Sequence, residues 1–468
     1  MWHIAKRELY DNLNSLRFAL TTVLLLALML TNAIVHLREH PKRVQKYNDA
    51  VTGYENRLAS YANESLYLLA QQGPGDLHKK PSPLHFCAEG GDAFLSGTVN
   101  AGDPFMYSAD MTGVWKLSYP AVTPNLENVR PDAIKLDWGF IIGYVLSLVA
   151  LLFTFDAISG ERERGTLRLM LANSIPRHTV LIGKFLGALI SVSIPFTLSV
   201  LINLLVISTD SDLHLNAEAW ERLGIIFCIA LLYMSLFLAL GLLVSTRVRQ
   251  SAVSLVILLL VWVTLVVFMP NTLASMTGEF SPSMLSGEFW KRYRQLHQEL
   301  DEKYEDRVWS DNSDIKTLTA RSEYFSLHVV LDERLNEDRL NLQINQFRHA
   351  RSIIRVSPVA IVQHLLESFA GTGFERHLQF IENTQRYARH FREFVVDTDR
   401  KDPKSRHLIG IREGMAEKPV SPASVPKFED TLSLSKDFNT RAMELLLLTL
   451  FVMVLLSGAY LAFVRVEV

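Results

Sequence analysis

Six apolar runs, each long enough to cross a lipid bilayer as a helix, constrain the fold of this chain more than any other feature of its sequence. A bilayer offers no hydrogen-bond partners to exposed backbone, so these runs must be helical. The expected fold class is an all-α membrane protein with six transmembrane helices and a mainly helical external domain built from two insertions. The transmembrane helices are expected at residues 18–36, 138–156, 180–207, 223–245, 251–269 and 442–464.

Lysine and arginine residues in the short segments predict the orientation of the chain. An even number of spans places both termini on one side, and that side carries most of the basic residues of the short segments. The opposite short loop has acidic residues and no basic residue before Arg222. Residues 38–46 oppose the rule, but they open a long segment, where the rule is weak. Both termini are therefore expected in the cytoplasm, and the first span is expected to be an uncleaved anchor.

The two insertions are residues 37–137 and 270–441. They lie outside the spans and together contain more than half of the chain. Apolar residues at helical spacing predict that the first insertion begins as a helix and then becomes irregular. In the second, Phe289, Leu296 and Tyr304 belong to a strongly amphipathic helix. Another helix is expected to begin at Ser357 and to end at Gly371. The two insertions are expected to pack on each other, with a proline-rich extended stretch leading to the last span.

The loop between the second and third spans, residues 157–179, is the most informative segment. Gly165 can break the preceding helix, and Leu167 and Leu171 give the short helix that follows an apolar face. Ser174 then ends this helix, and Pro176 follows just beyond. A short helix with apolar and charged faces, held between two spans, suits docking onto a cytosolic partner.

This loop resembles the membrane subunits of ABC-2 type transporters, which carry E-x-E-x-G-T-L, then P-x-x-R or a close variant, then G-K at the next span. The basic residue departs from that pattern, because Arg177 directly follows the proline. The large insertions, together with residues 357–373, resemble the permeases related to copper-enzyme maturation and gliding systems. The matching residues of the loop are Glu161, Glu163, Gly165, Thr166, Leu167, Pro176, Gly183 and Lys184.

The resemblance implies that the chain is the permease subunit of an ATP-driven exporter in a bacterial inner membrane. It implies two kinds of partner: a P-loop ATPase subunit, which binds ATP and Mg, and a second permease subunit, identical or related. The external domain would handle cargo, or the ATP cycle would perform mechanical work on a periplasmic partner. The residues that couple the chain to the ATPase would be Glu161, Arg162, Glu163, Gly165, Thr166, Leu167, Leu171, Ser174, Pro176 and Arg177.

Several classes of function lack support in the sequence. No G-x-x-x-x-G-K-[ST] motif occurs, so ATP must be bound by another chain, and no cofactor is expected here. No spacing of catalytic residues stands out, so the chain is not expected to be an enzyme. The net charge of -2 gives no electrostatic footprint for nucleic acid. The middles of the spans hold almost no ionisable residues, which disfavours ion-coupled transport.

Residues 1–17 are expected to form an interfacial helix on the inner leaflet, the alternative being a helical extension of the first span. In the third span, Gly183, Gly187 and Pro195 suit either packing within the bundle or a gating helix. Arg441 and Glu444, one turn apart near the outer end of the last span, are interpreted as an interfacial ion pair rather than a proton relay.

The external segments contain several histidines and one cysteine, which are residue types that bind metals. His85 and Cys87 have suitable chemistry for a soft metal, but without a visible third and fourth ligand they indicate an incidental pair. The other external histidines are expected to be solvated on charged helical surfaces, namely His297, His349, His364, His377 and His390.

A second hypothesis of another class is a membrane-anchored receptor or assembly scaffold with a ligand-binding external domain. Six spans exceed what an anchor requires, and no signalling domain lies on the expected cytoplasmic side. Purification together with an ATPase would separate the two hypotheses.

Overall fold

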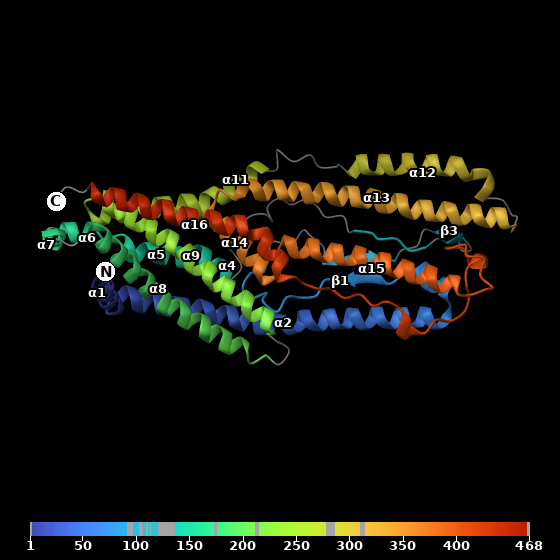
Figure 1. Ribbon diagram of the computed structural model, residues 1–468, viewed down its shortest axis with the longest axis horizontal. Coiled ribbons are helices and arrows are strands. Elements are labelled where there is room, and N and C mark those ends of the chain that lie inside the picture. The colour runs from blue at the N-terminus through green and yellow to red at the C-terminus, as the bar shows by residue number, and fades with distance from the viewer. Residues whose placement is uncertain are drawn as a thin grey trace.

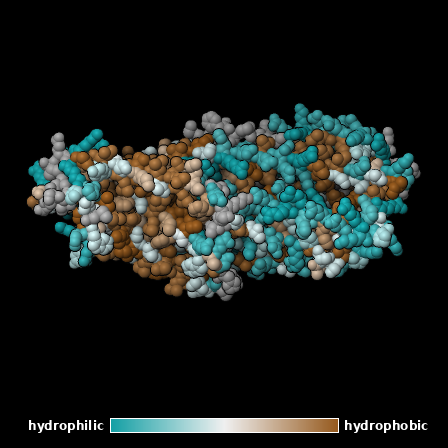
Figure 2. All heavy atoms as spheres, in the orientation of Figure 1, coloured by the Kyte–Doolittle hydropathy of each residue, from teal (hydrophilic) through white to brown (hydrophobic). Residues whose placement is uncertain are grey.

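The molecule is elongated, with an apolar helical bundle at one end and a polar helical lobe at the other (Figure 1). Apolar side chains cover the bundle end and hydrophilic ones cover most of the lobe end (Figure 2). We call these parts the span bundle and the polar lobe. The computed structural model describes residues 2–90, 97–102, 106–108, 111–112, 114–119, 136–172, 176–210, 215–277, 286–308 and 314–465.

Among the described residues, six helical stretches in the span bundle are long and apolar enough to cross a membrane, which confirms the expected all-α fold with six spans. Most of these helices extend beyond the apolar runs, because their polar ends find partners in neighbouring elements. The second and fifth spans each contain a π-helical turn. The spans are built from α2 (Leu16–Glu64), α4 (Trp138–Phe140) with η3 (Ile141–Leu146) and α5 (Ser147–Thr154), α8 (Arg177–Ile207), α9 (Ala217–Arg247), α10 (Ser251–Trp262) with η4 (Val263–Phe268) and α11 (Met269–Thr277), and α16 (Leu434–Val464).

The N-terminal helix α1 (Trp2–Leu13) is separate from the first span. The hydroxyl oxygen of Ser15 accepts a hydrogen bond from the backbone N–H of Phe18, so a capping residue begins a new helix there. This break disagrees with the alternative that α1 extends the first span. The next helix, α2, then continues for 49 residues from the span bundle into the polar lobe (Figure 1).

The two insertions pack on each other, as expected. Tyr54 and Leu58 of α2 share one core with Phe347, Phe391 and other residues of the second insertion. The hydroxyl groups of Tyr54 and Tyr387 are 2.8 Å apart in this core. The lobe helices are α3 (Leu66–Gln72), α12 (Ser286–Val308), α13 (Ile315–Ile354), α14 (Pro358–Ala370) and α15 (Phe374–Arg400).

The first insertion contains short strands where only irregular structure was expected after its first helix. Gly75–His78 (β1) pairs antiparallel with Thr98–Ala101 (β2), with Gly75 opposite Ala101. A second small pair joins Met106–Ser108 (β3) and Met111–Thr112 (β4). The stretch from residue 401 to residue 433 is not one extended segment, because turns and two 3₁₀ helices, η5 (Arg412–Gly414) and η6 (Pro422–Ser424), interrupt it. His407 and Gly410 adopt positive φ values in this stretch.

Helix α14 lies between the span bundle and the polar lobe, and every one of its residues is buried. It begins after Ser357 and ends at Gly371, whose φ of +67° favours glycine, as the sequence predicts. The burial of this helix overturns one expectation, because His364 is buried, and His377 on the following helix α15 and His297 on α12 are buried as well. The prediction that these three histidines are solvated was wrong, because the faces that carry them pack against other helices.

Candidate functional site

The loop between the second and third spans folds as two short helices, α6 (Ser159–Glu163) and α7 (Thr166–Ala172). Gly165 between them has a φ of +73°, a conformation that strains residues with a Cβ, so a glycine suits this turn. We call residues 159–172 the α6–α7 segment. It lies at the end of the span bundle away from the polar lobe, where α1 and the C-terminal end of α16 also lie (Figure 1).

Glu161 connects the segment to α8 and, through it, to α1. One carboxylate oxygen of Glu161 lies 3.5 Å from the ammonium group of Lys184, and the other accepts a hydrogen bond from the hydroxyl of Thr166. Lys184 also pairs with Glu8 of α1. Because Lys184 is buried, these two carboxylates compensate a charge that would be costly to bury alone.

Glu163 and the residues before α6 connect the segment to α9 and α10. The carboxylate of Glu163 accepts hydrogen bonds from the hydroxyl and from the backbone N–H of Ser251, the latter at 3.0 Å. Ser251 is the first residue of α10, where backbone N–H groups lack helical partners and a negative charge is favourable. The backbone N–H groups of Ile158 and Ser159 both donate to the hydroxyl oxygen of Ser245 on α9, at 3.0 Å.

The start of the third span connects the same region to the last span. Pro176 precedes α8 as its N-cap residue, and the guanidinium of Arg177 donates to the carbonyl oxygen of Phe463 on α16 at 2.9 Å. The α6–α7 segment therefore bonds directly to α8, α9 and α10, and α8 bonds in turn to α1 and α16. A displacement of the segment would act directly on three helices and, through α8, on two more.

The outer surface of α7 is available to a partner. Leu169 is 70% exposed, and Thr166 and Arg168 are exposed beside it, whereas Leu167 is buried against the bundle. The side chain of Leu171 and all of Ser174 lie outside the described residues. Of the residues predicted for coupling, Glu161 and Glu163 bond to other helices of this chain, to Lys184 of α8 and Ser251 of α10. Thr166 is exposed, as is Leu169 on the same helix.

Gly183, Gly187 and Pro195 are all buried on α8. At Gly187 the close contact is with α1, because a Cβ there would lie 2.7 Å from the Cβ of Glu8 and 3.1 Å from the carbonyl oxygen of Ala5. Gly187 thus permits α1 to pack on the third span. Nothing in the structure tests a gating role.

His85 and Cys87 lie near the end of the polar lobe that faces the bundle. A guanidinium nitrogen of Arg43 is 2.7 Å from Nδ1 of His85, and Cys87 is buried. Among the described residues, no group of three or more histidine, cysteine, aspartate or glutamate side chains is arranged to hold a metal ion.

A second group of charged residues gathers where the span bundle meets the polar lobe. Arg441 and Glu444 of α16 form a buried ion pair at 2.9 Å, and Arg355 at the C-terminal cap of α13 and Glu375 of α15 also contact this pair. The pair is therefore not simply interfacial, as the sequence indicated, because it belongs to a larger network. We call this network the charged layer, and its residues are Arg222, Arg351, Arg355, Glu367, Glu375, Asp437, Arg441 and Glu444.

The charged layer joins spans to lobe helices through balanced ion pairs. Arg222 of α9 lies 2.8 Å from Asp437 of α16, and Arg351 of α13 pairs with Glu367 of α14. Burial and the surrounding guanidinium groups hold the pKa of His364 well below its usual value, so this histidine stays neutral. Each helix at the junction is thus held by charge-assisted contacts.

Sequence reasoning missed the partners of several of these groups. Lys184 was recognised only as part of a motif, and Arg222 was used only to orient the chain. A useful signal was available, because a charged residue within or beside an apolar run requires a partner when the run is buried. The sequence gives no means of choosing that partner.

The six spans, the segment between the second and third, and the polar lobe together define a multi-pass membrane protein. A family model described as "ABC-2 family transporter protein" matches residues 2–348. The chain therefore belongs to this family, which confirms the resemblance seen in the loop. A second model, a domain of unknown function (DUF3526), matches residues 327–408, which include all of α14 and α15.

Two curated relatives are both described as "Probable ABC transporter permease protein NosY". The protein from Pseudomonas aeruginosa is 50% identical over 44 residues, which are 9% of this chain and 16% of that protein. The protein from Stutzerimonas stutzeri is 29% identical over 150 residues, or 30% of this chain and 53% of that protein. The chain thus spans about half the length of the second relative and less of the first.

Proposed function

We propose that this chain is the permease subunit of an ATP-driven exporter, and that a separate P-loop ATPase drives it through the α6–α7 segment. The observation that carries the proposal is that this segment bonds to α8, α9 and α10, with α1 and α16 joined to it through α8, while α7 exposes Leu169 at the end of the molecule. A partner that moves α7 would therefore move the bundle. ATP and Mg would be bound by that partner, because this sequence lacks a P-loop motif.

The same proposal assigns an orientation. The α6–α7 segment, both termini and Arg247 with Arg249 would face the cytoplasm of a bacterial inner membrane, and the polar lobe would lie in the periplasm. The basic residues near the span ends favour this direction. In this orientation α1, whose Trp2 is 63% exposed, lies at the inner leaflet as an interfacial helix.

The polar lobe would receive the motion of the bundle. Two features support such transmission: α2 runs without a break from bundle to lobe, and the charged layer ties α9 and α16 to α13, α14 and α15. The lobe would then receive, shield or hand over a cargo, or the ATP cycle would perform mechanical work through it on a periplasmic partner. Ion pairs that can exchange partners suit a junction with two arrangements.

A second permease subunit, identical or related, would complete the transporter. The fifth span supports this assembly, because only 17% of its apolar window is buried within this chain, against 61% for the fourth span. Val256 and Leu260 of α10 expose apolar side chains that lipid or a second subunit would cover.

The experiment is purification of the tagged chain from native membranes in mild detergent, followed by identification of a co-purifying P-loop protein and measurement of ATP hydrolysis. In the variant E161A/E163A, the contacts to Lys184 and Ser251 are lost. We expect the ATPase to dissociate, or its hydrolysis to become independent of the permease.

The matched control is Asp11→Ala, which removes a 65% exposed acidic side chain on α1 at the same end of the molecule. This variant should retain both the ATPase and its coupling. Recovery of the wild-type chain without any nucleotide-binding protein would contradict the proposal and favour a receptor or scaffold.

A further inference from the structure

An arginine-lined cavity of about 770 Å³ lies at the end of the span bundle that carries the α6–α7 segment. Its walls come from α6, α7, the end of α9, the turn before α10 and the end of α16. Leu167, Thr246 and Ala462 contribute small or apolar wall segments. Six arginines line the cavity: Arg162, Arg164, Arg168, Arg247, Arg249 and Arg465.

The positive charge of this cavity is not neutralised from within the described chain. Glu163, the one acidic residue among the lining residues, has its carboxylate bonded to Ser251. Glu161 is engaged with Lys184 and Thr166, and its distance to Arg164 is 3.9 Å. Across the described residues, no carboxylate lies within 4.0 Å of the other five lining arginines.

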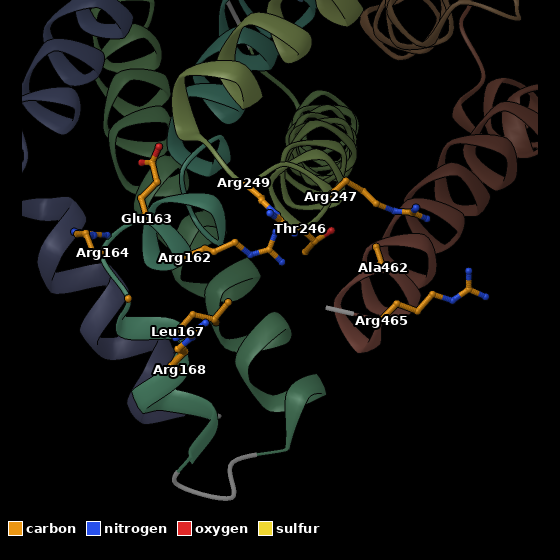
Figure 3. A pocket seen from close by; sticks show the side chains of 11 residues that line it. Arg162, Glu163, Arg164, Leu167, Arg168, Thr246, Arg247, Arg249, Ala462 and Arg465 are labelled. Atoms are coloured by element: carbon orange, nitrogen blue, oxygen red, sulfur yellow. The ribbon is translucent and has the colours of Figure 1, made fainter. Parts of the chain in front are cut away.

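The guanidinium groups are directed so that they can share a ligand. In Figure 3, Arg162 and Arg249 extend toward each other from α6 and from the turn before α10, while Glu163 points away from them. Like charges so placed repel one another, and an anion between them would remove that repulsion. The planar fork of arginine matches the oxygen atoms of a phosphate group, with two hydrogen bonds to each group.

Exposed apolar side chains of α16 and α10 follow or precede the lining residues along the chain. Leu461 and Val464, next to the lining residues Ala462 and Arg465, are 59% and 44% exposed, and Val253 of α10 is 43% exposed. A ligand with a phosphate headgroup in the cavity would therefore find apolar side chains beside it for hydrocarbon chains. A soluble anion would use the arginines and leave this apolar surface unused.

We propose that this cavity binds the phosphate headgroup of an anionic phospholipid from the adjoining leaflet, with Arg162 and Arg249 at its centre. Basic cavities between membrane helices are a recognised means of binding such headgroups. Because the cavity walls include α6 and the end of α16, a bound lipid would also hold the α6–α7 segment against the last span. The proposal does not depend on the ATPase.

The test uses native mass spectrometry of the full-length chain in mild detergent, titrated with phosphatidylglycerol, cardiolipin or phosphatidylcholine. The variant R247Q/R249Q removes two lining charges from a turn outside the α6–α7 segment. We expect its apparent affinity for the two anionic lipids to fall at least about tenfold, with phosphatidylcholine unaffected. Arg465→Gln, on a different helix, should weaken the same lipids even if the double variant does not fold.

The control is Arg7→Gln, which removes an 84% exposed arginine of α1 at the same end and outside the cavity, and which should bind like the wild type. Equal lipid affinity in wild type and both cavity variants would overturn the proposal. So would displacement of the lipid by inorganic pyrophosphate at equal affinity, since the site would then serve a soluble anion. Loss of the ATPase with unchanged lipid binding in R247Q/R249Q would reassign the cavity to the protein interface.

Discussion

Gly187 illustrates how a single residue controls the position of a whole helix. The close approach of α1 at this point brings Glu8 to Lys184, and Lys184 in turn reaches Glu161 in the α6–α7 segment. A side chain at residue 187 would push α1 away and strain both ion pairs. The absence of a side chain at Gly187 is therefore needed for the ion pairs that connect α1 to the α6–α7 segment.

We predict that Gly187→Ala destabilises the protein by about 1–3 kcal/mol, because the new Cβ would have to be accommodated against the Glu8 side chain and a backbone carbonyl. Gly224→Ala is the matched control on the next span, since no atom lies within 4 Å of a Cβ built there. Removing a helical glycine should stabilise the control by about 0.5–1 kcal/mol. Thermal unfolding in detergent measures both, and changes of the same sign would contradict the packing interpretation.

At the scale of elements, the charged layer decides how the lobe helices meet the spans. Arg351 and Glu367 join α13 to α14 through an ion pair whose two side chains are each 6% exposed. The guanidinium of Arg351 also lies over the ring of Phe347, 4.9 Å from its centroid. A buried pair of this kind contributes little net stability against an apolar replacement, but removal of one partner leaves a charge without compensation.

A double-mutant cycle tests this. We predict that Arg351→Met and Glu367→Leu each cost about 3–5 kcal/mol, and that the double variant costs clearly less than their sum. Chemical unfolding of the four proteins gives the coupling free energy. Additive effects would show that the two side chains act independently, which would weaken the case for a connected layer.

At the scale of the whole molecule, buried neutral histidines make the polar lobe sensitive to acid. Burial lowers the pKa of His328 to about 4 and that of His377 to about 3. The neighbouring His297 adds to the lowering of the pKa at His328, and Lys79 and Arg376 add to it at His377. The ring of His328 is stacked on His297 at 4.3 Å, which brings two imidazoles together. The folded lobe therefore disfavours protonation of His328 and His377.

We predict that the melting temperature falls as the pH is lowered from about 7 to about 5. In this window the unfolded chain, whose histidines have ordinary pKa values near 6.5, binds more protons than the folded protein. The contribution of the two histidines to the free energy of unfolding is therefore complete above about pH 6.5 and is lost as the pH falls below that value. His328→Phe keeps an aromatic ring and removes one such group, so its melting temperature should depend less on pH. Parallel curves for variant and wild type would exclude His328 as a cause.

The sequence by itself determined the six spans, because apolar runs of that length can satisfy their backbone groups in a bilayer only as helices. It also determined the amphipathic α12, the ends of α14 and the family motif around Gly165, since each depends on local periodicity or turn chemistry. These features need no knowledge of distant neighbours.

The tertiary structure alone decided which charges meet. Lys184 pairs with Glu8, 176 residues away, and the arginines of the cavity come from the α6–α7 segment, from the end of α9 and the turn after it, and from the end of α16. The same holds for His364 and His377, whose charged neighbours suggested solvent exposure until packing buried them. Helical periodicity gives the face on which a side chain lies, but its partner depends on how helices cross, and that is set by the packing of the whole molecule.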